Sequence, residues 1–185
     1  MDIKIYHDPW KHVVIDNFLP DNIYNELMEN RKEFIELFKQ TYIPTIHHFA
    51  WNYQKDHYSH GVHALSPNKF HKYVKQFPNL VLCYKNLYEF FSDTHDSFIK
   101  DVYSIFHNDY PESFAYGVQI QNKGYEYPIH EDGQQKKIST LTYLSENNIG
   151  TYLYKSKDQD YNKPTKEIEW KPNRAFIFTR ENCWH

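Results

Sequence analysis

The spacing of apolar residues divides the chain into a helical front and a stranded back. From residue 21 to residue 40 apolar side chains recur at helical intervals, and Asp21 is a good N-cap, which predicts one amphipathic helix. After Pro111 the period changes to two, and short alternating segments follow one another between turn residues. The predicted strands of this back half are 113–121, 137–144, 151–155, 166–170 and 174–179.

The remaining segments complete this outline. The apolar run near the start predicts a strand that ends in a turn at Pro20, and proline at the first position of a helix marks another start at Ser66. A long aromatic and histidine-rich stretch between them has no period, which is typical of a loop. The segments assigned in this way are a strand within 11–19, a loop over 41–65 with at most a short strand, a helix over 66–77, and one or two helices over 79–107 with a break near residues 92–93.

Helices followed by a series of short strands favour an α+β fold. The spacing of the strands predicts a sandwich or jelly roll over residues 111–185, with the helices of residues 1–110 packed against it. The length of 185 residues and the mass of 22.6 kDa are enough for one domain with a core of its own. We therefore expect a single domain over residues 1–185.

Composition excludes several classes of protein. The chain has 21 basic and 24 acidic residues, a net charge of −3, and it lacks the basic excess of a protein that binds nucleic-acid backbones. We find no apolar run of 18 residues and no signal-peptide pattern at the start, so we expect no membrane partner. The two cysteines, Cys83 and Cys183, lie far apart and form no metal or disulfide motif. These features predict an intracellular, cytoplasmic protein.

Histidine is the one residue type whose abundance points to chemistry. Twelve histidines among 185 residues invite a metal hypothesis, but they also produce accidental motifs: about 0.8 His-x-Asp triplets are expected by chance, and two occur. The first, His107–Asn108–Asp109, follows a predicted helix and precedes a proline, so we interpret it as a helix terminus. The triplet alone therefore decides nothing.

The second triplet, His130–Glu131–Asp132, stands in a more informative place. It lies between a predicted strand that ends near Ile129 and one that begins near Lys137, so we expect an extended segment. Alternate residues of an extended segment point to the same side, which would bring His130 and Asp132 together. A further histidine would complete the set of two histidines and one carboxylate that binds non-haem Fe(II) and leaves positions open for reaction. His185 is the only histidine after His130.

At this point the chain resembles a known family, the Fe(II)- and 2-oxoglutarate-dependent oxygenases of the prolyl-4-hydroxylase-like type. The resemblance follows YGVQIQNKGYEYPIHEDG, KKISTLTYLSE, NIGTYLY and EWKPNRAFIFTRENCWH in this order over residues 113–185. The opening VVIDNFLPDNIYNELM is similar to the usual first strand and helix of the family. The resemblance implies a double-stranded β-helix, or cupin-like jelly roll, with N-terminal helices.

The resemblance also implies a reaction and its residues. His130, Asp132 and His185 would be the Fe(II) ligands, Tyr143 would bind the distal carboxylate of 2-oxoglutarate, and Gln121 would face the co-substrate from another strand. The implied activity is a dioxygenase that uses O2, converts 2-oxoglutarate to succinate and hydroxylates a small-molecule or peptidyl substrate. A carboxylate at position 132 favours hydroxylation over halogenation, because halogenating relatives lack it.

One departure from the family concerns the co-substrate. The family places an arginine or lysine on the strand after the distal histidine, where it pairs with the 2-oxoglutarate carboxylate. This sequence ends at His185, so we expect a core that lacks its last strand or strands and has impaired binding as it stands. The nominal substitutes within the sequence are Arg174, Arg180, Lys137 and Lys155.

Other features have structural interpretations. We expect loops to contain the histidines at positions 57, 60 and 63, which are spaced three apart, and the pair at 47–48. The tryptophans are expected in a core or pocket wall. Cys183 has no base beside it that would make it a nucleophile. The alternative to an oxygenase is a metal-binding or sugar-binding jelly roll without turnover. The two hypotheses differ in whether the chain binds 2-oxoglutarate.

Overall fold

The computed structural model describes residues 2–40, 59–61, 76–94, 100–106, 119–121, 128–133, 136–146 and 149–185. The chain is α+β with antiparallel sheets, as the residue pattern predicts. It forms two compact units, and each is described by itself. The first unit contains Met1–Tyr24, Asp101–Asp109 and Ile129–His185, and the second contains Asn25–Lys100 and Tyr110–Pro128.

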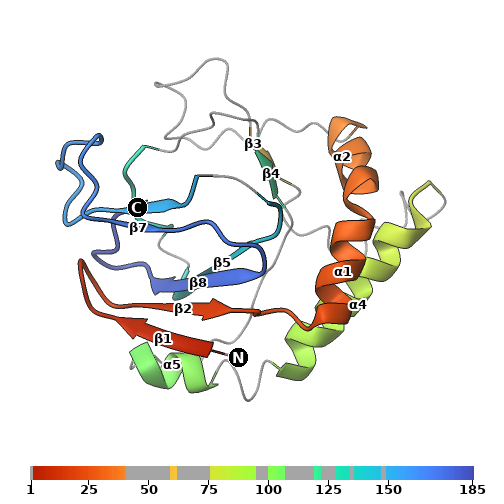
Figure 1. Cartoon of the computed structure of the whole chain (residues 1–185), viewed down its shortest axis with the longest axis horizontal. Helices are drawn as coiled ribbons and strands as arrows, with labels where there is room; N and C mark the ends of the chain where they lie inside the picture. Colours follow the sequence, from red (N-terminus) through yellow and green to blue (C-terminus); the bar gives the residue numbers. More distant parts are fainter. Residues whose placement is uncertain are drawn as a thin grey trace. The chain divides into compact units, whose positions relative to one another are not determined.

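A four-stranded antiparallel sheet with the order β1-β2-β8-β5 forms the centre of the first unit (Figure 1). Its third strand, β8, is hydrogen-bonded on both sides, and four of its six residues are buried. A ribbon of β6 and β7 forms a second sheet in the same unit. The bounds are β1 Asp2–Tyr6, β2 His12–Asp16, β5 Ile138–Tyr143, β6 Thr151–Leu153, β7 Lys166–Ile168 and β8 Arg174–Thr179.

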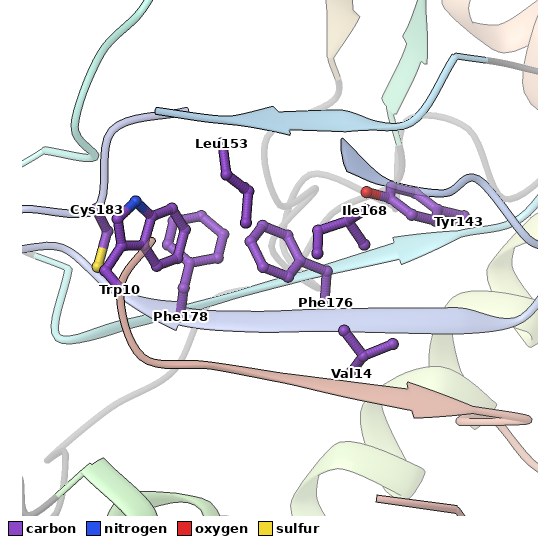
Figure 2. Close-up of a cluster of buried hydrophobic side chains, with 8 residues drawn as sticks. All are labelled: Trp10, Val14, Tyr143, Leu153, Ile168, Phe176, Phe178 and Cys183. Atoms are coloured by element: carbon purple, nitrogen blue, oxygen red, sulfur yellow. The ribbon is translucent and has the colours of Figure 1, made fainter. Parts of the chain in front are cut away.

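The core of this unit lies between the two sheets. Figure 2 shows Phe176 and Phe178 of β8 pointing toward Leu153 of β6 and Ile168 of β7. Directly opposite residues in antiparallel strands share a face, so the register places Val14, Phe176 and Leu141 on this side of the sheet. The buried members of the cluster are Trp10, Val14, Tyr143, Leu153, Ile168, Phe176, Phe178 and Cys183. Trp10 is thus a core residue, one of the two roles expected for the tryptophans.

The second unit is mainly helical in its described part. Its helices are the end of α1 (Asp21–Glu29), α2 (Arg31–Gln40) and α4 (Pro78–Thr94), and it also holds the short ribbon of β3 (Ser59–Gly61) and β4 (Gln119–Gln121). Helix α5 (Lys100–Phe106) belongs almost entirely to the first unit. No helix in the described ranges is long and apolar enough to cross a membrane.

The predicted helix over 21–40 is wrong in one respect, because two helices occupy it. Asn30 separates them: its side-chain amide donates to the carbonyl of Glu26 at 2.8 Å, and its own carbonyl accepts from the amide of Phe34 at 3.2 Å. Asparagine competes with the backbone for such bonds and is a poor residue for a helix interior. The side chain of Asn30 therefore ends one helix where the next begins.

Other boundaries also differ from the prediction. Strand β1 was not predicted, and α4 runs through the expected break near residues 92–93 as far as Thr94. No strand ends near Ile129, because the described residues 128–133 are irregular and begin with Pro128, which has no N–H to donate. The helix predicted over 66–77, most of the 41–65 loop and most of the 113–121 strand lie outside the described residues.

A buried amide fastens the segment after β2 to the turn before β8. Asn173 has a positive φ of 57° and is 5% exposed. Its side chain accepts from the amide of Leu19 at 2.8 Å and donates to the carbonyl of Leu19 at 2.8 Å. Its own backbone N–H donates to Tyr143 at 2.7 Å. One residue thus ties together the segment after β2, the end of β5 and the start of β8.

We expect Asn173→Ala to destabilise the fold by about 2–4 kcal/mol, because it leaves two buried backbone groups of Leu19 without partners. The matched control is Asn17→Ala, since Asn17 also has a positive φ, 53°, but is exposed. That substitution should cost about 1 kcal/mol, the penalty for alanine in the left-handed region. Urea unfolding of both variants gives the comparison, and equal losses would contradict a role for the side-chain bonds.

A second prediction concerns His12, which is fully buried between aromatic rings in β2. Burial lowers the pKa of its imidazole from 6.5 to about 4, and the Lys166 ammonium near its Nε2 acts in the same direction. The unfolded chain therefore binds more protons than the folded chain between pH 6.5 and pH 4. The contribution of His12 to the free energy of unfolding is fully present above pH 6.5 and falls as the pH is lowered. The loss from this group alone is about 3 kcal/mol at pH 4.

The non-titrating variant His12→Gln should remove this part of the pH dependence. Urea midpoints measured from pH 7 to pH 4 are expected to fall more steeply in the unmodified chain than in the variant. Parallel curves would show that His12 does not titrate on unfolding.

Candidate metal centre

Two segments that are far apart in the sequence meet beside the core of the first unit. The N–H of His130 donates to the carbonyl of His185 at 3.0 Å, and the N–H of His185 donates back to the carbonyl of His130 at 3.1 Å. Such a reciprocal pair is the basic unit of an antiparallel ladder. The amide of Tyr154, the residue after β6, donates to the carbonyl of Trp184 at 2.9 Å, which holds the last residues against this segment as well.

The three predicted ligands come together at this point. His130, Asp132 and His185 each offer one ligand atom, and these atoms lie within 4.8 Å of one another. The two imidazole rings are 4.4 Å apart, centre to centre, and are tilted by 49°. All three residues are partly buried, and no other group of three such side chains meets the same criterion among the described residues.

The ring of His185 is held in an orientation that suits a ligand. Its Nδ1 lies 2.9 Å from the carbonyl of Cys183, and because a carbonyl can only accept, Nδ1 carries the proton. Phe178 packs edge-on against the ring with centroids 4.5 Å apart. Burial lowers the pKa of His185 to about 4, with a smaller contribution from His130. At neutral pH the ring is uncharged, and Nε2 has its lone pair available for a metal.

Two hydrogen-bond donors that follow Asp132 in the chain hold its carboxylate. Lys136 donates to one carboxylate oxygen, Oδ1, at 2.7 Å, and the Ser139 hydroxyl donates to the other, Oδ2. Burial raises the pKa of Asp132, but these hydrogen bonds and the Lys136 charge outweigh it, so the net pKa is lowered. The carboxylate is therefore ionised at neutral pH. Neither donor was predicted, since no sequence motif marks them.

The donor set fits a first-row divalent metal such as Fe(II). Metal bonds of about 2.0–2.2 Å put neighbouring donors about 3 Å apart, and the three ligand atoms already lie within 4.8 Å of one another. Each ionised carboxylate oxygen has more than one lone pair, which leaves Asp132 able to bind a metal in addition to a hydrogen bond. Two neutral imidazoles and one carboxylate are the ligands that Fe(II) takes in sites with open positions.

The residues expected to bind 2-oxoglutarate are less clearly disposed for it. Tyr143 is 4% exposed at the end of β5, its hydroxyl lies 2.6 Å from that of Thr151, and its ring stacks on Trp170. Burial raises the pKa of Tyr143 to about 12, so the phenol keeps its proton. Gln121 lies in β4 of the second unit, and its side chain is outside the described part. Its role stays a prediction.

The four basic residues that could replace the family's arginine or lysine are either paired with a carboxylate or exposed. Arg174 makes a two-pronged ion pair with Asp16, at 2.6 and 3.2 Å, and its hydrogen bond lowers the pKa of that carboxyl to about 2. Arg180 contacts its neighbour Glu181 at 3.4 Å. Lys137 and Lys155 are exposed, and we assign neither to the site.

Cys183 is buried beside the site but is not disposed to react. It is 2% exposed, and burial raises the pKa of its thiol. Its sulfur lies 3.4 Å from the Thr179 hydroxyl and 3.3 Å from the carbonyl of Glu181, neither of which is a base. A buried protonated thiol is a poor nucleophile.

Comparisons of the chain with family models, with curated proteins and with solved structures find no match. The assignment of the site therefore depends on its own geometry and on the sequence resemblance.

A bound divalent metal should stabilise the fold, because the site is assembled only when the chain is folded. Mn(II) at 100 times its dissociation constant is expected to add about 2.7 kcal/mol to the free energy of unfolding, seen as a rise in the thermal midpoint. His130→Gln and His185→Gln should lose this rise, whereas His7→Gln, at an exposed histidine outside the site, should keep it. A rise of equal size in all four proteins would argue against the site.

Proposed function

We propose that the chain is an Fe(II)- and 2-oxoglutarate-dependent dioxygenase that hydroxylates a substrate not yet identified. The observation that carries the proposal is the meeting of His130, Asp132 and His185, whose ligand atoms lie within 4.8 Å of one another. The positions of these residues in the sequence and the resemblance to the family both predict this ligand set independently of the fold. Its members come from two segments that are more than 50 residues apart.

We further propose that the two sheets of the first unit form a double-stranded β-helix. Its support is the pair of antiparallel sheets whose apolar faces enclose one core, β1-β2-β8-β5 on one side and β6-β7 on the other (Figure 2). The candidate ligands lie at one end of this core, where His185 packs against Phe178. The resemblance implies that a jelly roll of the oxygenase type binds its metal at one end of the core.

Each residue has a distinct task in the proposed reaction. His130, Asp132 and His185 hold the metal, and the hydrogen bond from Nδ1 of His185 to Cys183 keeps Nε2 unprotonated. When bound, Fe(II) and 2-oxoglutarate would together activate O2, with loss of CO2, formation of succinate and transfer of one oxygen atom to the substrate. Tyr143 would donate its phenolic proton to the far carboxylate of the co-substrate. The buried aromatic residues around Phe178 exclude water from one side of the site.

A second function, metal binding without use of 2-oxoglutarate, is favoured by one specific observation. Arg174 shares the inner face of the sheet with Tyr143, because the two residues are directly paired in β5 and β8. Its guanidinium is committed to Asp16 and Glu169. With the charge of Arg174 already neutralised, the region beside Tyr143 would bind a dicarboxylate weakly. The alternative is therefore a jelly roll that binds a metal or a sugar without turnover.

The test is the formation of succinate from 2-oxoglutarate with anaerobically loaded Fe(II), followed by addition of O2. We expect measurable turnover that is abolished in Asp132→Ala and unchanged in Asp160→Ala, which removes a carboxylate from an exposed loop. Tyr143→Phe should raise the concentration of 2-oxoglutarate needed for half-maximal turnover by about tenfold, the loss of one hydrogen bond to a charged group.

Two results separate the candidate functions. Binding of Mn(II) without binding or turnover of 2-oxoglutarate would overturn the oxygenase and support the non-catalytic alternative. Failure to bind any divalent metal would overturn both the oxygenase and the non-catalytic metal-binding function.

A further inference from the structure

We propose that Ser139 and Lys136 control the Asp132 carboxylate in opposite ways. Ser139 is a positioning residue that orients the carboxylate for a metal ion, and Lys136 is a stand-in cation that neutralises the carboxylate until a metal displaces it. This inference rests on the proposed metal centre and adds two residues to it. It concerns the affinity of the site for the metal and not the later reaction.

The starting point is that Asp132 needs partners in the metal-free protein. Its side chain is 12% exposed, and an ionised carboxylate removed from water costs free energy unless it is paired. Ser139 and Lys136 provide a partner for each of its two oxygens. The Asp132 carboxylate is thus paired with one ammonium group, and a divalent ion bound to it would change this pairing.

Ser139 is suited to a fixed role. It lies within β5, where its backbone is paired with Phe178 of the central strand, and it is 8% exposed. Its hydroxyl has one proton, and because an ionised carboxylate only accepts, that proton is donated to Oδ2 of Asp132. A hydrogen bond to one oxygen fixes the plane of the carboxylate while the other oxygen remains able to bind a metal. Ser139 therefore has no need to move when a metal binds.

Lys136 is suited to a transient role. Its amide donates to the carbonyl of Gly133 at 3.0 Å, which turns the chain back so that the ammonium reaches Oδ1 of Asp132 at 2.7 Å. The side chain is 48% exposed and can swing into water at small cost. A divalent ion bound to the same oxygen would lie within a few ångströms of the ammonium and repel it. Lys136 must therefore leave Oδ1 or weaken the binding of the metal.

The two roles predict opposite effects on metal affinity, which a general loss of stability cannot imitate. Lys136→Met keeps most of the aliphatic stem and removes the competing charge, so its affinity for metal should increase about tenfold. Ser139→Ala releases the carboxylate from its orientation, so its affinity should fall at least about tenfold, as for other residues that orient metal ligands. Ser139→Thr keeps the hydroxyl and should remain close to the unmodified chain.

The experiment is a titration of the metal-free chain with Co(II), followed by the visible absorption of the bound ion. Lys137→Met is the matched control, because it removes the same charge from an exposed neighbour one residue away. Its affinity should change less than twofold, since a solvated charge is largely screened. Thermal unfolding without metal shows that each variant is folded before its affinity is compared.

The outcomes are distinct. Tighter binding by Lys136→Met than by Lys137→Met, together with weaker binding by Ser139→Ala and recovery in Ser139→Thr, supports the inference. Equal or weaker binding by Lys136→Met than by Lys137→Met overturns the stand-in role, and unchanged binding by Ser139→Ala overturns the positioning role, while the metal centre itself stands in both cases. No Co(II) binding by the unmodified chain overturns the metal centre and this inference with it.

Discussion

The constraint on which the first unit depends is the burial of the four middle residues of strand β8. It is paired on one side with β2 and on the other with β5, and the four residues from Ala175 to Phe178 have no exposed surface. A strand in this position cannot shift by one residue, because each side chain would move to the opposite face. The strand therefore fixes the register of both neighbours, and with them the positions of Ser139 and Tyr143.

The candidate site inherits its precision from that strand. Phe178, next to last in β8, contacts the ring of His185, and the six residues that follow the strand turn back to pair with His130. Neither His130 nor His185 lies in a regular strand, so two reciprocal backbone hydrogen bonds pair these residues as a strand ladder would. A further bond from the amide of Asn182 to the carboxylate of Glu131, at 2.5 Å, joins the same two segments. Contacts within the chain thus hold the two histidine backbones beside each other.

Sequence reasoning was strongest where one physical pattern dominates. Strand β8 was predicted with its observed bounds because RAFIFT combines strand formers with a turn on either side, and β5 was predicted to within a residue at each end. Strand β1 was missed although Ile3 and Ile5 alternate with polar residues, because five residues at a chain end give a weak signal. These two isoleucines are about half exposed, at 48% and 46%, so little burial reinforces the pattern.

The parts of the site that could not be predicted are those set by distant partners. The sequence gives no sign that Arg174 is committed to Asp16, 158 positions away, or that Asn173 is buried against Leu19. His130, Asp132 and His185 were predicted from their positions in the sequence and from a family resemblance, and only the fold could show that they meet. Lys136 and Ser139 are ordinary residues in a turn and a strand, and they become informative only once Asp132 is seen between them.

The distribution of charge explains why the metal half of the proposal has more support than the co-substrate half. Around Asp132 the neutral ring of His185, the carboxylate and one half-exposed ammonium form a site that a divalent cation would suit. Around Tyr143 the situation is reversed, because a dicarboxylate would add negative charge where Arg174 is already paired with two acidic residues. The Tyr143–Thr151 hydroxyl pair has two protons and uses one for its mutual bond, so one proton remains to be donated. A single neutral hydrogen bond orients a carboxylate but does not neutralise it. Use of 2-oxoglutarate therefore requires either that its carboxylate compete with Asp16 for Arg174 or that its binding energy come chiefly from the metal.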